Sequence, residues 1–172
     1  MKHLEEESIN QLLGIIPAYP ATRIMHISDG GEQLYYALRA LSLEEEYEYL
    51  LATTNEDFYE ALKRVHRPSP LQLIKKISLD QKNYAPMVKQ YDFLFVSAEI
   101  PLEFENKFVK KVHGHIKSSG NIILFLPKND PELIQRWYAH LEEHLYVAMN
   151  TIDLFEHYEI LIAKKMHGWG GK

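Results

Sequence analysis

The stretch that most constrains the fold of this chain is an apolar run that ends in an acidic, glycine-containing turn. Residues 23–27 have the pattern of a buried strand, residues 28–31 form the turn, and residues 34–41 have the pattern of an amphipathic helix. In doubly wound α/β proteins a nucleotide-type cofactor sits at such a turn, because glycines let the backbone approach the ligand at the head of a helix. The turn constrains the fold more tightly than it constrains the activity.

Strand-like and helix-like segments alternate about five times after this point, and a hairpin-like pair of strands finishes the chain. We expect strands at residues 24–27, 47–53, 74–79, 93–96, 121–127, 146–151 and 158–164. We expect helices at residues 33–41, 56–65, 104–116 and 130–144. Such alternation predicts a parallel sheet with helices on both faces, whose ligands bind beyond the carboxyl ends of the strands.

Particular residues are expected to start and stop these elements. Asn55 has the chemistry of an N-cap for the helix at 56–65, and Pro131 suits the first helical position of the helix at 130–144. Ser118-Ser119-Gly120 is expected to close the helix at 104–116, and Ser69-Pro70 could start a helix in place of the third strand. Residues 1–20 form an appendage with a short helix from about Ser8, and residues 167–172 a glycine-rich tail with Trp169.

Composition limits the classes of function. The 172 residues are expected to form one main α/β domain at 21–166, and the absence of cysteine excludes disulfide and thiolate chemistry. The formal net charge of −5 gives no general attraction to a phosphate backbone, so nucleic acid is an unfavoured partner. The basic stretches 63–67 and 107–117 are interpreted as solvated helix faces. No signal peptide or membrane span is evident, and a cytoplasmic location follows by default.

Over residues 21–166 the chain resembles the class I S-adenosylmethionine-dependent methyltransferases, including their spermidine-synthase-like relatives. The first feature is the strand-turn-helix at 24–41. The second is Leu79-Asp80 followed by an aromatic-Asp pair and the strand at 91–96, similar to the family's adenine-contacting acid and its fourth strand. The third is the segment 117–127, similar to the family's helix, Pro-Gly-Gly turn and fifth strand. The resemblance implies a Rossmann-like fold, a seven-stranded sheet with a terminal antiparallel hairpin, and S-adenosylmethionine as cofactor.

The chain departs from the family's first motif, an acid followed by three glycines at alternate positions. His26 stands at the acid position and Ser28 at the first glycine position, while Gly30 stands at the second and Glu32 at the third. A side chain at Glu32 would crowd a close-packed turn. The family's second strand ends in an acid that hydrogen-bonds the ribose hydroxyls, whereas here the nearest candidates are Thr53 and Thr54, with Glu56 displaced into the next helix.

The resemblance and the expected edge of the sheet together select a set of cofactor-binding residues. Asp80 could accept a hydrogen bond from an adenine amino group, or could only form a local turn. Asp29 could orient the backbone or the cofactor's amino-acid end, or could only form a turn. Glu99 could act as a general base if burial raised its pKa, although a solvated loop glutamate is more common. The cofactor set is Ser28, Asp29, Gly30, Gly31, Thr53, Asp80 and Ser97.

Histidines supply the remaining candidate chemistry. His140-Leu141-Glu142-Glu143-His144 matches the H-x-x-E-H pattern of inverted zinc metallopeptidases, but lacks an evident third ligand and is interpreted as a polar helix flank, so no metal is expected. His113 and His115 project to different helix faces, which disfavours a shared metal. His26 lies inside a predicted buried strand and is interpreted as a hydrogen-bonded core histidine, or alternatively as an acid–base group.

These observations lead to one leading function and two alternatives. The leading hypothesis is a S-adenosylmethionine-dependent methyltransferase with weakened cofactor motifs, acting on a small or partner-presented substrate, with only the N-terminal appendage to serve as a lid. The first alternative is a non-catalytic methyltransferase fold used for interaction or assembly, including homo-oligomers, with Glu32 filling the cofactor crevice. The second is aminopropyl transfer, disfavoured because no acidic polyamine pocket is identifiable.

Overall fold

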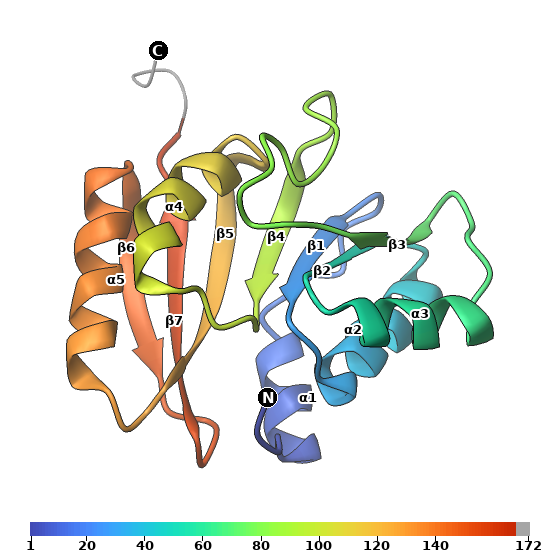
Figure 1. Cartoon of the computed structure of the whole chain (residues 1–172), viewed down its shortest axis with the longest axis horizontal. Helices are drawn as coiled ribbons and strands as arrows, with labels where there is room; N and C mark the ends of the chain where they lie inside the picture. Colours follow the sequence, from blue (N-terminus) through green and yellow to red (C-terminus); the bar gives the residue numbers. More distant parts are fainter. Residues whose placement is uncertain (168–172) are drawn as a thin grey trace.

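The computed structural model of the chain describes residues 1–167 (Figure 1). The predicted tail beyond His167, including Trp169, lies outside the described residues. Within residues 1–167 no helix has the length and hydropathy to cross a membrane.

The structure is built on one seven-stranded sheet with the order β3-β2-β1-β4-β5-β7-β6. All pairs among β3, β2, β1, β4 and β5 are parallel, whereas β7 is antiparallel to both β5 and β6. The predicted mostly parallel, Rossmann-like sheet with a terminal antiparallel hairpin is therefore confirmed. The strands are β1 (Arg23–Ser28), β2 (Glu48–Thr53), β3 (Gln72–Lys76), β4 (Tyr91–Val96), β5 (Ile116–Pro127), β6 (Tyr146–Ile152) and β7 (Tyr158–Lys165).

Helices cover both faces of this sheet, as the alternation predicts. One core cluster contains apolar residues of α1 (Glu6–Leu13), α2 (Glu32–Glu45) and α3 (Glu56–Val65). The other contains residues of α4 (Glu105–His113) and α5 (Pro131–Glu143), and a 3-10 turn at Leu102–Phe104 precedes α4. In Figure 1, α4 and α5 lie beside β5–β7, and α2 and α3 lie beside β1–β3. Strand order reverses between β1 and β4, which places the switch point at the carboxyl end of β1.

Side-chain caps define two of the helix starts, and the sequence predicts the first cap and the proline that follows the second. The Asn55 side chain accepts a hydrogen bond from the Phe58 backbone N–H and begins α3. Asp130 does the same for α5 with Leu133, and Pro131 follows it at the start of the helix. The expected N-cap Ser8 is wrong, because α1 begins at Glu6 and no side chain caps it.

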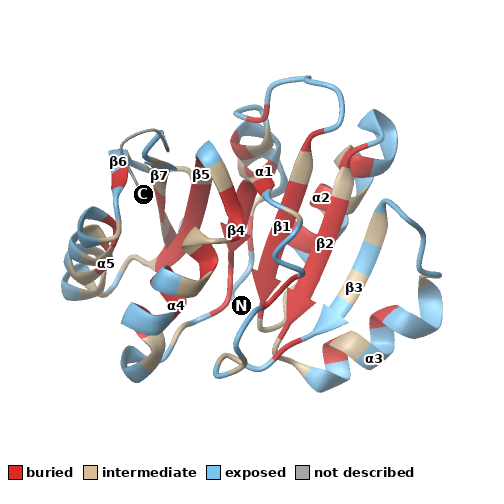
Figure 2. Ribbon diagram, turned by 90° about the horizontal axis from the view of Figure 1, so that it is seen from above, coloured by how far each residue is buried: buried red, intermediate tan, exposed pale blue. Residues whose placement is uncertain are grey.

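The third strand forms at Gln72–Lys76, two residues earlier than expected, and no helix starts at Ser69-Pro70. It lies at the edge of the sheet, and Figure 2 shows it intermediate or exposed while β1 and β2 are buried almost throughout. A loop, residues 77–90, then crosses to β4. Tyr84 of this loop is buried in the core, and its hydroxyl donates a hydrogen bond to the Leu79 carbonyl at 2.7 Å.

The predicted helix stop at Ser118-Ser119-Gly120 is wrong, because α4 ends at His113 and these three residues lie inside β5. Ser119 has a left-handed φ of +68°, and the β4–β5 register shifts between Tyr91 and Phe93. A Cβ at Gly120 would lie 2.7 Å from Ile116 Cγ2 and 3.0 Å from the Asp92 carbonyl. The glycine therefore permits a close approach at an irregularity of the strand.

Candidate functional site

The turn that follows β1 requires its two glycines. Gly30 and Gly31 have φ values of +126° and +111°, which L side chains rarely adopt. The Ser28 hydroxyl accepts from the Gly30 N–H and donates to the Gly30 carbonyl, both at 3.0 Å. Gly31 precedes α2 without any side-chain cap, so the helix begins with N–H groups that no capping side chain engages.

Asp29 joins this turn to the two neighbouring loops. Its carboxylate accepts a hydrogen bond from the backbone N–H of Glu99 at 2.9 Å, and its carbonyl accepts one from Asn55 Nδ2 at 3.1 Å. The loops after β1, β2 and β4 are thereby held together. Asp29 orients backbone through these bonds, and its contact with the cofactor's amino-acid end stays a prediction.

The end of β2 offers no carboxylate. Thr53 is fully buried, and its hydroxyl accepts from the Asn55 backbone N–H at 3.1 Å. Glu56 begins α3, is exposed and pairs with Lys76 at 3.2 Å. A cofactor ribose at the end of β2 would therefore find no carboxylate to accept hydrogen bonds from its hydroxyl groups.

A buried histidine connects β1 to both of its neighbours. His26 is fully buried, with Nδ1 2.9 Å from the Tyr49 hydroxyl on β2 and Nε2 2.7 Å from the Ser97 hydroxyl at the end of β4. Burial lowers the pKa of His26 to about 3, so the imidazole is neutral at physiological pH. Both ring nitrogens have partners, which favours the interpretation of His26 as a hydrogen-bonded core histidine. Ser97, a predicted cofactor residue, points its hydroxyl at His26.

Sequence analysis missed the role of Tyr49. His26 pairs with Leu51 and Phe95 in the sheet, and Tyr49 and Ser97 lie two residues away along the two neighbouring strands. Since alternate residues share a face, all three polar side chains lie on one face of the sheet. The period-2 position of Tyr49 in its strand is the signal that could have identified it.

Asp80 lies in an exposed turn after β3. Its carboxylate accepts from the Ser78 hydroxyl, and this bond is the main cause of its lowered pKa. Lys111 of α4 donates to the carbonyls of Leu79 and Gln81 at 3.0 and 2.7 Å, which fixes the turn against α4. The carboxylate is therefore ionised, accessible and held at the carboxyl side of the sheet.

A cavity of about 750 Å³ opens beyond the carboxyl ends of β4 and β5, next to these loops. We call it the β4–β5 cavity. Its walls combine apolar and aromatic residues with charged and polar ones, and it is lined among others by Val96, Glu99, Phe125, Asp130, Trp137 and Tyr158. None of the seven predicted cofactor residues lines it. Glu99 is exposed in this wall, so the burial that a general base would require is absent.

The N-terminal segment lies between the glycine turn and this cavity. The Lys2 N–H donates to the Tyr158 hydroxyl at 2.7 Å, and the backbone of Leu4 exchanges two hydrogen bonds with the Gln33 side chain, at 2.8 and 2.6 Å. A Cβ at Gly31 would lie 3.2 Å from Met1, whose side chain therefore packs on the turn. Residues 1–4 cover the approach to the turn, and Met1 and Lys2 line the cavity.

Comparison with solved structures gives one consistent fold. A SAM-dependent O-methyltransferase from Thermotoga maritima matches with a TM-score of 0.70 and 13% identity, over 96% of this chain and 67% of that protein. Human methyltransferase-like protein 13, in complex with SAH, matches with 0.65 and 14%, over 95% and 80%. The CurJ carbon methyltransferase matches with 0.67 and 13%, over 94% of this chain but 53% of its own length. No protein-family profile and no curated protein matches the sequence.

This chain has the class I methyltransferase fold. At such low identities the similarity extends to the fold alone, and this chain spans about half of the CurJ enzyme.

The methyltransferase cofactor fits one part of the site better than another. The glycine turn fits it, because two residues with φ values open to glycine allow close approach to the uncapped start of α2. Glu32, at the family's third glycine position, is the exposed first residue of α2 and does not line the β4–β5 cavity. The end of β2 fits less well, because the Thr53 hydroxyl is already engaged and carries no charge.

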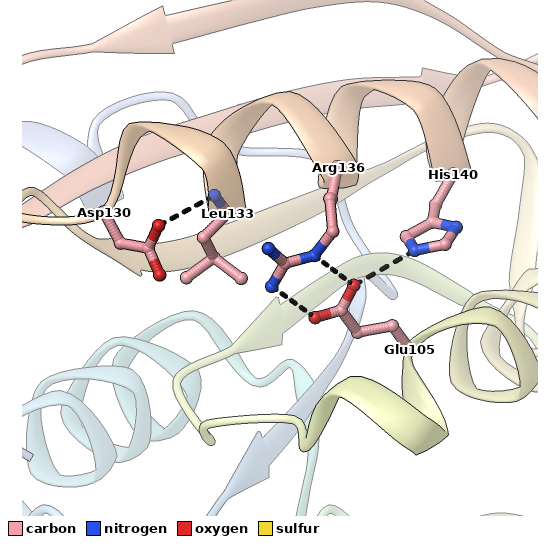
Figure 3. A network of polar contacts seen from close by, with 5 residues as sticks. All are labelled: Glu105, Asp130, Leu133, Arg136 and His140. Atoms are coloured by element: carbon pink, nitrogen blue, oxygen red, sulfur yellow. Dashed lines mark hydrogen bonds and ion pairs between the residues drawn. The ribbon is translucent and has the colours of Figure 1, made fainter.

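The histidine motif on α5 is occupied by interhelical contacts. Glu105 of α4, which is 1% exposed, accepts two hydrogen bonds from Arg136 at 3.2 and 3.1 Å and lies 3.1 Å from His140 Nε2 (Figure 3). His144 contacts Asn106 at 2.9 Å. Within residues 1–167 no group of three or more His, Cys, Asp or Glu side chains could hold a metal ion. The motif joins α4 to α5, as its interpretation as a polar helix flank implies.

Proposed function

We propose that this chain is a S-adenosylmethionine-dependent methyltransferase with a reduced set of cofactor contacts. The single observation that carries the proposal is the glycine turn, which lies at the switch point of the sheet beside the β4–β5 cavity. Ligands of open α/β sheets bind at this point.

Three predicted residues would contact the cofactor from two sides, and a fourth would position two of them. The backbone at Gly30 and Gly31 allows the amino-acid end to approach α2, and Asp29 fixes the loop that carries them. The exposed, ionised Asp80 carboxylate would accept a hydrogen bond from the adenine amino group. When bound, the cofactor supplies the methyl group to be transferred.

The β4–β5 cavity would hold the acceptor. Its aromatic walls, Trp137 and Tyr158, suit an apolar part of a substrate, and Glu99 offers a carboxylate at the same wall. Its volume suits a small molecule or a single side chain presented by a partner. Residues 1–4 would close over both ligands.

Thermal-shift titration with S-adenosylhomocysteine tests the proposal. A ligand selective for the native state raises its stability by about 2.7 kcal/mol at 100 times its dissociation constant. We expect a saturable rise in Tm that is lost in Asp80→Ala and kept in the matched control Asp57→Ala, an exposed aspartate on α3. A flat curve for the wild-type protein at millimolar ligand would overturn the proposal.

A second candidate, a non-catalytic interaction module, is favoured by the contacts that close the crevice. Asp29 is bonded to Glu99, Asn55 packs on Gly30, and Met1 packs on Gly31. This candidate predicts no response to S-adenosylhomocysteine together with stable self-association in sedimentation velocity. A monomer that responds to the ligand excludes it.

A further inference from the structure

A second, smaller recess lies on the face of the sheet covered by α2 and α3, at the amino ends of β2 and β3. It has a volume of about 30 Å³. Tyr35 and Arg39 of α2, Tyr49 of β2 and Gln72 of β3 line it, together with Lys63 of α3 and residues 66–68, which follow this helix. We call it the basic recess. It lies at the opposite end of the strands from the glycine turn, so the proposed methyltransferase site does not account for it.

The charge of the basic recess is unusual for this protein. The chain has a formal net charge of −5, yet Arg39, Lys63 and Arg67 all line the recess, and no Asp or Glu does. None of the three cations takes part in the ion pairs found among residues 1–167. Bringing three like charges together without a counter-charge costs free energy, which an anion would recover.

Two buried nitrogen atoms in the same recess lack hydrogen-bond partners. These are His66 Nε2 and Gln72 Nε2, both inaccessible to solvent. A buried polar atom without a partner is uncommon and costs stability. Burial and the nearby Arg39 lower the pKa of His66, so its imidazole is neutral and has one N–H to donate. A ligand that accepts hydrogen bonds would satisfy both groups.

We propose that the basic recess binds the terminal phosphoryl group of a small molecule. Arg39 and Arg67 would hold the phosphoryl oxygens with their planar N–H donors, and Lys63 would add a third positive charge. Gln72 and His66 would donate hydrogen bonds from the interior. The recess is small, so only one anionic group would enter it and the rest of the ligand would stay outside. Three cations suit a dianion better than a carboxylate.

The recess suits a single group better than a nucleic-acid backbone. A protein that tracks a strand uses an extended basic groove with stacked aromatic platforms, whereas Tyr35 and Tyr49 are each only 2% exposed. The proposal is independent of the methyltransferase proposal, because the two sites share none of their ligand-contacting residues.

Titration of the whole chain with inorganic phosphate, at constant ionic strength and followed through the histidine imidazole NMR signals, tests this inference. His66→Gln assigns the signal of His66. We expect a saturable shift of that signal, with binding about tenfold weaker in Arg39→Gln and unchanged in the matched control Arg64→Gln. Arg64 is also on α3 but does not line the recess. Should Arg39→Gln fail to fold, Arg67→Gln carries the same expectation from an exposed position.

Three further probes separate the sources of binding. Phenyl phosphate should bind at least as tightly as inorganic phosphate, and acetate about tenfold more weakly. An absent shift, equal binding of acetate, or equal binding to Arg64→Gln and Arg39→Gln would overturn the proposal. So would tighter binding of a single-stranded RNA oligonucleotide than of phenyl phosphate, which would assign the recess to nucleic acid.

Discussion

The two halves of the carboxyl edge of this sheet are built in opposite ways. Around β1 and β2 the polar side chains turn inward, so that Ser28, Asp29 and Thr53 all bond to backbone of the chain itself. Beyond β4 and β5 the edge opens into a cavity of about 750 Å³. Polar groups at the carboxyl edge are therefore engaged in internal contacts around β1 and β2, whereas the edge beyond β4 and β5 is open.

His26 connects the two halves, and its protonation should give the largest effect on stability. Burial lowers its pKa to about 3, against 6.5 for an exposed histidine. Between these values the unfolded chain binds more protons than the native protein, so the free energy of unfolding falls as the pH is lowered. Each pKa unit corresponds to about 1.4 kcal/mol. Because the unfolded chain is already half protonated at pH 6.5 and the native protein is half protonated at pH 3, the predicted loss between these pH values is about 4 kcal/mol.

Urea unfolding at a series of pH values between 7 and 4 measures most of this loss. Other histidines with lowered pKa values, such as His113, add to the wild-type slope, so the comparison is with His26→Gln. We expect a clearly shallower slope in that variant and an unchanged slope in His3→Gln, whose side chain is exposed. Equal slopes in all three proteins would contradict the role given to His26.

The bond between Asp29 and the loop after β4 should give the next largest effect. Asp29→Ala removes the charged acceptor of the Glu99 N–H, which we expect to cost about 2 kcal/mol. Glu99→Ala is the matched control, because it keeps the backbone donor, and it should change stability by less than about 0.5 kcal/mol. If the two variants are equally stable, the bond from Glu99 to Asp29 does not hold the loops after β1 and β4 together.

The two helix N-caps, one in each half of the edge, should give a smaller difference in stability. Asn55 and Asp130 both cap a helix, and such a cap contributes about 1 kcal/mol. Asn55 also donates to the Asp29 carbonyl on the closed side. Asn55→Ala should therefore lower the free energy of unfolding by about 1 kcal/mol more than Asp130→Ala does. Equal costs in urea unfolding would show that the second bond contributes nothing.

The fold follows from the sequence where patterns are local. Apolar runs, the N-cap Asn55 and the helix-starting Pro131 placed the strands and helices in the right order. The predicted helix stop at Gly120 is wrong for a physical reason. Glycine is used both at the end of helices and where two backbone segments approach closely inside a sheet. Only the contact with Asp92, far away in the sequence, distinguishes the two uses.

The site was less predictable for the same reason. Residue type selected Ser28, Asp29 and Thr53, but whether a hydroxyl or carboxylate faces a ligand or the chain depends on partners distant in sequence. Glu99 donates to Asp29 from 70 residues away. Tertiary structure likewise determines that residues 1–4 cover the glycine turn and that Arg39 and Arg67 line the same recess.

The most direct test of the account is to locate S-adenosylhomocysteine on the protein by amide NMR. We expect the largest saturable shifts at the backbone amides of Gly30 and Gly31, with smaller ones around Asp80. Shifts confined to the β4–β5 cavity, or no shifts at millimolar ligand, would contradict the claim that the cofactor binds at the glycine turn after β1.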